Sequence, residues 1–233
     1  MSRRLILSAG RGARSDQIIV LAYCIAEQES QFDVPLHGVH GQPVRWFDVA
    51  ALRCFVSNFS SHMLDQPAPE ILTAFHQVLH AIFSRTTIIP FRFPTVVENE
   101  GVLRRFLESH SPEYRSALRH LRNKVQMDVR LTVEPDRASE PPQQSGKSYL
   151  EHRRARHRDI QSILEKFRCA ANSLAENWVQ HDTPSGTRGF ALVDRSALPL
   201  FLEKIGRVLT PAGISVRITG PWAPSEFVEV THD

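Results

Sequence analysis

The chain has 233 residues, 42% of them hydrophobic, and its 28 lysines and arginines against 25 acidic residues give a formal net charge of +3. This length allows one large domain or two small ones, each with enough apolar residues to bury a core. The small net charge does not by itself indicate a nucleic-acid-binding protein, and no apolar run approaches the ~20 residues that a membrane-spanning helix requires.

Cysteine usage and the first residues give expectations about the compartment. Cys24, Cys54 and Cys169 are far apart in the sequence, which argues against C-x-x-C zinc and thioredoxin-type sites. An odd number of cysteines and no recognisable secretory signal favour the reducing cytoplasm. Residues 1–15 are basic, contain glycine and lack hydrophobic periodicity, so we expect a basic disordered tail. An anion-binding arm is the alternative.

Residues 16–96 are expected to form a first α+β domain. Residues 18–25 are continuously apolar, which is typical of a strand buried on both faces. Glycines and a proline in residues 36–48 favour a turn and a short strand, and residues 49–56 favour another strand. In residues 71–83, apolar side chains recur at three- and four-residue steps, which predicts an amphipathic helix.

Residues 86–93 predict the last strand of this domain. Pro90 has no N–H to donate, so we expect this strand at an edge of its sheet. In a regular strand, Phe91 and Phe93 would share one face and Arg92 would point to the other. Arg92 is then either a buried ion-pair partner or a ligand contact, and the ion pair is favoured.

Residues 97–233 are expected to form a second α+β domain. Two short amphipathic helices precede residues 125–133, in which apolar and polar side chains alternate throughout, as in a strand buried on one face. The proline-rich residues 134–147 predict a mobile loop, and residues 148–180 predict a long helix. A strand, a helix and a last strand follow, so both halves resemble small split α+β sandwiches.

The first part of the long helix concentrates positive charge. Residues 151–158 are polar all around the helix, so they project into solvent or meet a charged partner. Arg153, Arg154, Arg156 and Arg158 lack the interleaved aromatic residues of a platform for single-stranded nucleic acid. A solvated helix face is the favoured interpretation, and phosphate binding or an acidic protein partner are the alternatives.

Two histidine pairs have the spacing of metal ligands. His76 and His80 lie one turn apart on the predicted helix, as in zinc proteases, but Gln77 stands where the general base would be and cannot take a proton. His37 and His40 lie in a glycine-rich turn. We favour surface or structural roles for all four, and we expect no metal, cofactor or catalytic site. A metalloenzyme that uses these histidines is a competing hypothesis.

Trp222 lies between Pro221 and Pro224, just after the last predicted strand. A tryptophan in this position either plugs the edge of a core or anchors an interface, where tryptophan contributes disproportionately to binding. The core plug is favoured on the sequence alone.

Four segments, in order, resemble the gas vesicle protein GvpL/GvpF family. The first, Ile-Ile-Pro-Phe-Arg-Phe-Pro-Thr-Val, is similar to the family's "viPlRFGtv", and the last, Ile-Thr-Gly-Pro-Trp-Ala-Pro-Ser-Glu-Phe-Val, to "ltGPWPPYsFv". The two between them are similar to "l.gkvE.gvk" and "sG.aYL". The segments are residues 88–96, 121–130, 145–150 and 218–228.

The chain departs from the family pattern at a few positions within these segments. Pro94 replaces a glycine, Gln126 replaces a glutamate, and Ser225 and Glu226 stand where tyrosine and serine are usual. The fold that the resemblance implies is unaffected by these changes, but those at Pro94, Ser225 and Glu226 bear on the partner surface expected around residues 92–96 and 222–227.

The resemblance implies a non-enzymatic accessory protein of gas vesicle formation, which binds the hydrophobic shell protein or other accessory proteins during assembly. It also implies an N-terminal ferredoxin-like α+β domain and a C-terminal α+β domain with a long, coiled-coil-like helix. A cytoplasmic, vesicle-associated location follows. The candidate partner-binding residues are Arg92, Thr95, Tyr149, Arg153, Arg154, Arg156, Trp222 and Phe227. The alternative function is an anion- or nucleic-acid-binding module that uses Arg153–Arg158 and the basic tail.

Overall fold

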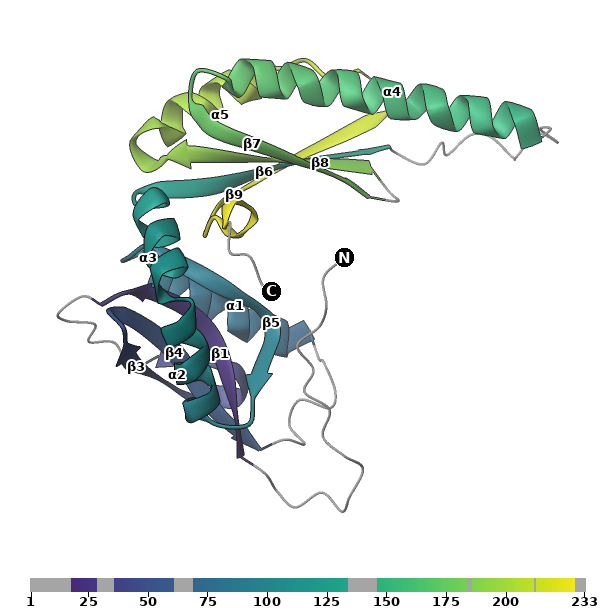
Figure 1. Cartoon of the computed structure of the whole chain (residues 1–233). Helices are drawn as coiled ribbons and strands as arrows, with labels where there is room; N and C mark the ends of the chain where they lie inside the picture. Colours follow the sequence, from purple (N-terminus) through teal and green to yellow (C-terminus); the bar gives the residue numbers. More distant parts are fainter. Residues whose placement is uncertain are drawn as a thin grey trace. The chain divides into compact units, whose positions relative to one another are not determined.

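The structure is a computed structural model of the whole chain, and it describes residues 18–28, 36–60, 69–133, 146–183, 186–211 and 213–228. These residues form two compact units: unit 1 runs to Arg122 and includes Val228, and unit 2 is Asn123–Phe227. Each unit combines an antiparallel sheet with helices (Figure 1), which confirms the α+β class. The predicted tail, residues 1–15, and nearly all of the predicted loop, residues 134–147, lie outside the described residues.

The sheet of unit 1 is antiparallel and has the strand order β2-β3-β4-β1-β5. β1 lies inside it and is buried from Val20 to Ala26, as its continuous apolar sequence predicts. Among the described strands, β5 pairs with β1 alone, so the edge position predicted from Pro90 is confirmed. The strands are β1 (Ile18–Glu27), β2 (Leu36–His37), β3 (Pro43–Val49), β4 (Leu52–Ser60) and β5 (Ile88–Val97).

Three helices cover this sheet. α1 (Pro69–Phe83) packs on β1 and β5 from behind in Figure 1, while α2 (Glu100–Ser109) and α3 (Ser111–His120) lie in front. The apolar side chains of α2 and α3 are buried against β1, β3 and β5. Because these two helices complete the core of unit 1, the units meet between Arg122 and Asn123, and not near residue 96 as the sequence analysis expected.

The strand β4, the helix α1 and the strand β5 form a split β-α-β arrangement, because β1 pairs with both strands and lies between them. This arrangement is one part of the ferredoxin-like pattern. The ferredoxin-like assignment of the whole N-terminal domain stays a prediction.

Unit 2 has the element order β-α-β-β-α-β and the strand order β7-β8-β6-β9, with every pair antiparallel. This is the element order of a split β-α-β sandwich. The alternating strand predicted at residues 125–133 is β6, whose odd-numbered residues from Val125 to Leu131 are buried. The elements are β6 (Lys124–Val133), α4 (Gly146–Ala171), β7 (Ala175–Thr183), β8 (Gly186–Asp194), α5 (Leu198–Gly206) and β9 (Ile214–Trp222).

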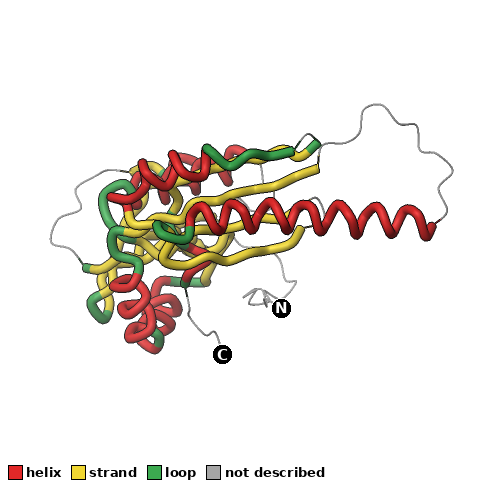
Figure 2. The backbone as a smooth tube through the Cα atoms, turned by 90° about the horizontal axis from the view of Figure 1, so that it is seen from above, coloured by secondary structure: helices red, strands yellow, loops and turns green. Residues whose placement is uncertain are grey.

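The long helix α4 ends at Ala171, so the predicted end near residue 180 is wrong. Trp178 continues the helical spacing of the apolar stripe, yet it belongs to strand β7, which pairs with β8. A Cβ atom on Gly189 of β8 would lie 2.3 Å from Cζ2 of Trp178, so the missing side chain makes room for the indole. Figure 2 shows the N-terminal part of α4 running beyond the ends of the strands.

Candidate partner-binding surfaces

The family-like stretch of β5 forms a large bulge at the sheet edge. Pro90 pairs with Cys24 and Thr95 pairs with Ala22, so the four residues between them on β5 face only Tyr23 of β1. The Thr95 hydroxyl donates a hydrogen bond to the backbone oxygen of Arg92 at 2.6 Å and closes the bulge. Bulges at sheet edges re-aim side chains and interrupt the pairing surface.

Arg92 lies in this bulge and is exposed. The expectation of a buried ion-pair partner is therefore wrong, because the bulge breaks the alternation on which it rested. The Phe93 ring packs edge-to-face on Phe75 of α1, with centroids 5.0 Å apart. The Phe93–Pro94 peptide bond, at the position of the family glycine, is cis. The bulge thus anchors one aromatic ring to α1 and leaves the arginine free to contact a partner.

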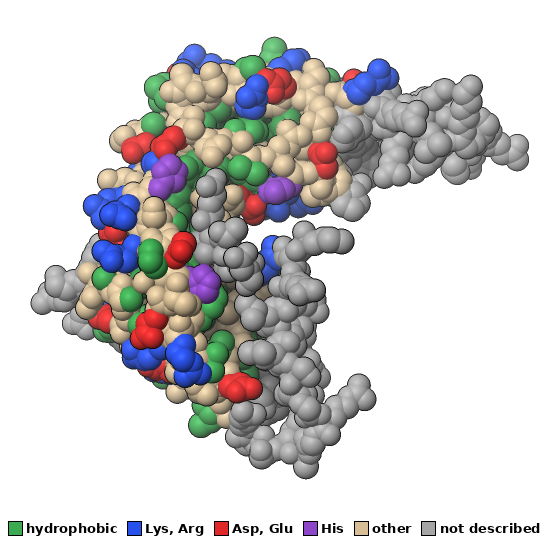
Figure 3. All heavy atoms as spheres, viewed as in Figure 1, with side chains coloured by type: hydrophobic (Ala, Val, Ile, Leu, Met, Phe, Trp, Pro, Cys, Tyr) green, Lys and Arg blue, Asp and Glu red, His purple; other side chains and the backbone are tan. Residues whose placement is uncertain are grey.

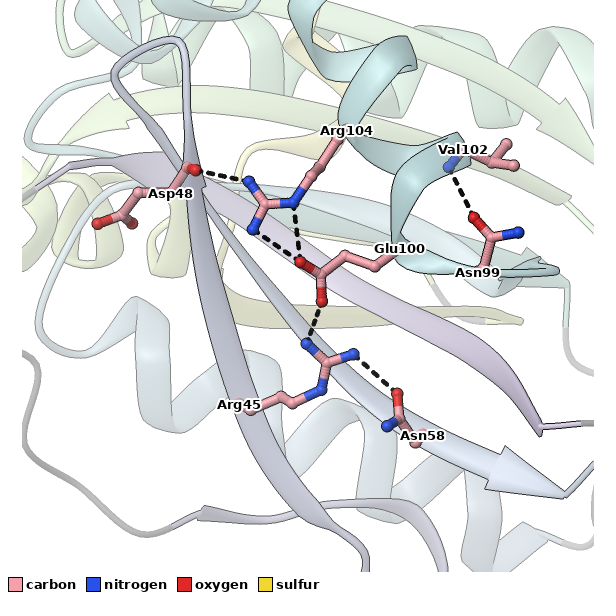
Figure 4. Close-up of polar contacts among 7 residues, drawn as sticks. All are labelled: Arg45, Asp48, Asn58, Asn99, Glu100, Val102 and Arg104. Carbon is pink, nitrogen blue, oxygen red and sulfur yellow. Dashed lines mark hydrogen bonds and ion pairs between the residues drawn. The ribbon is translucent and has the colours of Figure 1, made fainter.

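A connected polar cluster among the described residues of unit 1 ties α2 to the sheet (Figure 4). The Glu100 carboxylate lies between Arg45 of β3 and Arg104 of α2, and Arg104 Nη2 is 2.7 Å from Glu100 Oε1. Arg104 also donates to the Asp48 carbonyl and lies over the Phe47 ring, 4.3 Å from its centroid. Because the carboxylate is held by two arginines, which also contact the sheet through Asn58 and the Asp48 carbonyl, we assign the cluster a structural role.

A second pair stabilises the opposite side of strand β3. Arg53 donates two hydrogen bonds to the Asp48 carboxylate, at 2.8 and 2.9 Å. This charge-assisted contact, helped by Gln28, holds the pKa of Asp48 below its usual value. Arg53 also lies 5.5 Å from the centroid of the Trp46 ring, so this pair, too, is locked within the sheet.

In unit 2, Trp222 at the end of β9 is 46% exposed, so the expected core plug is wrong and the interface alternative remains. Its indole N–H donates to Thr219 at 3.3 Å, which fixes the ring near the sheet. Phe227, in the short 3-10 turn η4 (Ser225–Phe227), is instead buried. Of these two candidates, only Trp222 has a side chain that is exposed enough to contact a partner.

Two of the departures from the family pattern meet in unit 2, although they are 100 residues apart in the sequence. The backbone N–H of Glu226 donates to Oε1 of Gln126 at 2.9 Å. The Glu226 carboxylate lies 2.9 Å from Nε2 of His181 on β7. Comparison with the family pattern identified Gln126 and Glu226 as two separate departures, and only the pairing of β6 with β9 brings them together.

An ion pair beside this contact was not singled out from the sequence. Asp128 of β6 is buried and pairs with Arg188 of β8, whose guanidinium lies 5.0 Å from the centroid of the Phe190 ring. The sequence did give one indication of a functional or structural polar residue, because Asp128 is a polar residue of the regularly alternating strand at residues 125–133. Its partner could not be read from periodicity, because Arg188 comes from a distant strand.

The remaining candidates occupy α4 or the histidine pairs. Tyr149, Arg153, Arg154 and Arg156 lie on the N-terminal part of α4, and their side chains are outside the described residues. The histidines of both pairs are exposed, and the described residues include no group of three side chains suited to hold a metal. None of the described helices is long and apolar enough to span a membrane.

The strongest pKa perturbations lie in the core of unit 1. Burial raises the pKa of the Cys24 and Cys54 thiols far above their usual value. Burial, together with the nearby Cys54, raises the pKa of Tyr114 to about 12. Desolvation favours the neutral form of all three groups, so they behave as core residues.

The model of the gas vesicle synthesis protein GvpL/GvpF family matches residues 20–229. The chain belongs to this family. Membership gives this GvpL/GvpF protein a role in gas vesicle formation, and it confirms the resemblance seen in the four sequence segments. Gas vesicle protein L from Streptomyces sp. (strain CB03234) is 27% identical over 239 residues, covering 84% of this chain and 87% of that protein.

Two crystal structures share the fold of this GvpL/GvpF protein. Gas vesicle protein GvpF from Anabaena sp. PCC7120 matches with a TM-score of 0.76 and 18% identity, over 92% of this chain and 98% of that one. GvpF from Microcystis aeruginosa matches with a TM-score of 0.72 and 15% identity, over 91% and 99%. The two-unit α+β architecture is therefore that of GvpF proteins.

Proposed function

We propose that this GvpL/GvpF protein is a non-enzymatic accessory protein that binds the hydrophobic shell protein, other accessory proteins, or both, during gas vesicle assembly. The observation that carries the proposal is the family match over residues 20–229. The proposed location is the cytoplasm, in association with vesicles.

The bulge on β5 supports a binding role. It is built from the stretch that most resembles the family, and it presents Arg92 at a sheet edge while Ile88 and Ile89 of the same strand are buried. Edge strands and bulges are common places for contact with another chain. Arg92 and Thr95 are the proposed contact residues of unit 1, and Trp222 is the proposed contact residue of unit 2.

The distribution of charged and perturbed groups supports a non-enzymatic role. The largest rises in pKa belong to buried core groups, Cys24, Cys54 and Tyr114, and not to groups gathered in a cleft. Asp48, Glu100 and Asp128 are held in ion pairs with arginines. Buried neutral groups and ion-paired carboxylates are features of a protein that binds other proteins rather than one that catalyses a reaction.

A nucleic-acid-binding module remains the second candidate, because of Arg153–Arg158. Across the described surface visible in Figure 3, basic and acidic side chains are interspersed, which favours a protein partner over a phosphate backbone. Retention on nucleic acid that falls steeply between low and physiological salt would support this second candidate. Unchanged retention after replacement of these arginines would exclude it.

The test is a deletion strain of a vesicle-forming host, complemented with variants of this chain, and co-precipitation with the shell protein. We expect the Arg92→Ala variant to lower both vesicle yield and co-precipitation. The matched control is Arg105→Ala, an exposed arginine on α2 of the same unit, which should keep both. A deletion strain with normal vesicles would refute the proposed function.

A further inference from the structure

Three arginines and a histidine form a row across the whole sheet of unit 2. The strand registers pair His181 of β7 with Arg188 of β8, Arg188 with Arg130 of β6, and Arg130 with Arg217 of β9. Residues that face each other in a sheet point to the same side, so the four side chains share one face.

This face is the one opposite to helix α4. Gln161 of α4 contacts Asp182 and Gln180, which flank His181 on β7 and therefore point to the helix-covered side. The row of three arginines and His181 alternates with these residues, so it lies on the other side of the sheet. Arg130 and Arg217 are exposed, and the Arg188 side chain keeps 39% of its surface.

The row is only partly neutralised. Arg188 pairs with Asp128, and His181 contacts Glu226. Arg130 and Arg217 face each other directly across β6 and β9, and neither has an ion pair within the described part of the chain. Like charges directly opposite in a sheet are destabilising, so this arrangement points to a negatively charged partner that offsets the repulsion.

We propose that the exposed arginine row on this face of unit 2 binds an acidic helix of a protein partner, with carboxylates at positions i, i+4 and i+7. The proposal goes beyond the proposed function, because it concerns the chemistry of one surface and does not require the shell protein. Trp222 contacts Thr219, which pairs with Asp128 on the same face. Its exposed ring supplies an apolar anchor beside the arginines, and tryptophan and arginine dominate interface energetics.

The spacing of the row matches a helix laid across the strands. Neighbouring strands are about 4.8 Å apart, so Arg188, Arg130 and Arg217 span about 10 Å. Residues i and i+7 on a helix are also about 10 Å apart along its axis. Asp128 and Glu226 lie on the same face and interrupt its positive charge, which suits carboxylates at a few fixed positions better than a continuous phosphate backbone.

The experiment uses the full chain and a labelled, stapled helical peptide of about 16 residues, with glutamates at i, i+4 and i+7. A matched peptide with glutamines at these positions and a poly-thymidine oligonucleotide are the comparison ligands. Fluorescence anisotropy at two salt concentrations gives the affinities. We expect the glutamate peptide to bind about ten-fold or more tightly than the glutamine peptide, with salt weakening the difference.

Variants of the row test whether the arginines make the contact. Each of Arg130→Gln and Arg217→Gln should weaken binding of the glutamate peptide about two- to five-fold, as expected for exposed ion pairs. The double variant should weaken it about ten-fold. Arg207→Gln, an exposed arginine that directly follows α5 in the same unit, should leave the affinity unchanged. Arg130→Glu with Arg217→Glu should bind a lysine version of the peptide instead.

Three results would overturn the inference: equal binding of the two peptides, an equal effect of Arg207→Gln, or failure of the charge-reversed variant to bind the lysine peptide. Tighter, arginine-dependent binding of the oligonucleotide would assign the face to nucleic acid instead. Circular dichroism of every variant checks that a loss of binding is not a loss of fold. Failure here leaves the vesicle assay untouched, so the two proposals are judged separately.

Discussion

At the scale of single residues, Glu100 is the group that joins α2 to strand β3. Its partial burial raises the pKa, but hydrogen bonds from Arg45 and Arg104 outweigh this, and the net pKa is lowered. A carboxyl whose folded-state pKa lies below its unfolded-state pKa stabilises the fold above the unfolded value, about 4.3. This stabilisation is lost as the pH falls through the lower folded-state pKa.

The Glu100→Gln variant should therefore lower the free energy of unfolding by about 1–2 kcal/mol at pH 7. The difference from the unsubstituted protein should shrink as the pH falls below about 4.3, because the carboxyl of that protein then becomes neutral as well. Urea unfolding at a series of pH values measures this. Glu108→Gln, on the exposed side of the same helix, is the control. A difference that stays constant down to pH 2 would contradict the ion-pair explanation.

At the scale of elements, the packing of α4 on its sheet depends on a missing side chain. Gly189 of β8 faces α4, and an added Cβ would meet Trp178 at 2.3 Å and Cδ1 of Leu164 at 3.1 Å. The neighbours are an aromatic ring of β7 and a buried helix residue, so neither can move away cheaply. The glycine thus sets how closely the helix approaches the strands.

Gly189→Ala should destabilise the protein by about 1–3 kcal/mol, as overpacking of a core does. Gly206, in α5, has open space around its Cβ position. Gly206→Ala should therefore be neutral or stabilise by up to about 1 kcal/mol, since alanine favours the helix. Thermal unfolding of the two variants compares them directly. Equal melting temperatures would show that the packing of the Trp178 indole does not require a glycine at position 189.

At the scale of the whole molecule, the boundary between the units is the property to test. The backbone N–H of Leu121 bonds to Ala117 in unit 1, and the Asn123 carbonyl accepts from Arg195 in unit 2. These hydrogen bonds stay within one unit on each side of the Arg122–Asn123 bond. By contrast, Val96 and Val97 are paired with β1 inside the sheet of unit 1.

A Gly-Ser-Gly insertion between Arg122 and Asn123 should leave the protection of amide hydrogens in β1 and β6 unchanged, because loop lengthening costs little. The same insertion between Val96 and Val97 should increase exchange in β1 and β5. Hydrogen–deuterium exchange followed by mass spectrometry measures both. Loss of protection in either unit after the first insertion would move the boundary elsewhere.

Much of the fold was predictable, because local periodicity reports which face of an element is apolar. The continuous run of β1, the alternation of β6 and the stripe of α1 each predicted an element that the structure contains. The edge position of β5 followed from Pro90, since a residue without an N–H cannot complete a ladder on both sides. The family followed from four short segments in order.

The sequence predicted which residues belong to the candidate surfaces, but it did not predict which of them are exposed. Arg92 was placed in a regular strand, yet the bulge opposite Tyr23 exposes it. Trp222 was expected in the core, and it lies on the surface. In both cases a distant strand decided the outcome, because exposure depends on what pairs with a residue and not on its immediate neighbours in the chain.

The sequence by itself determined the α+β class, the main strands and helices, and the family, since these depend on residue types at short spacing. Tertiary structure alone decided that α4 stops at Ala171, that α2 and α3 belong to unit 1, and that three arginines line up across the sheet of unit 2. The physical reason is register. Which residues face each other across strands is fixed by which side chains the sheet buries against its helices, and that is a property of the packed molecule.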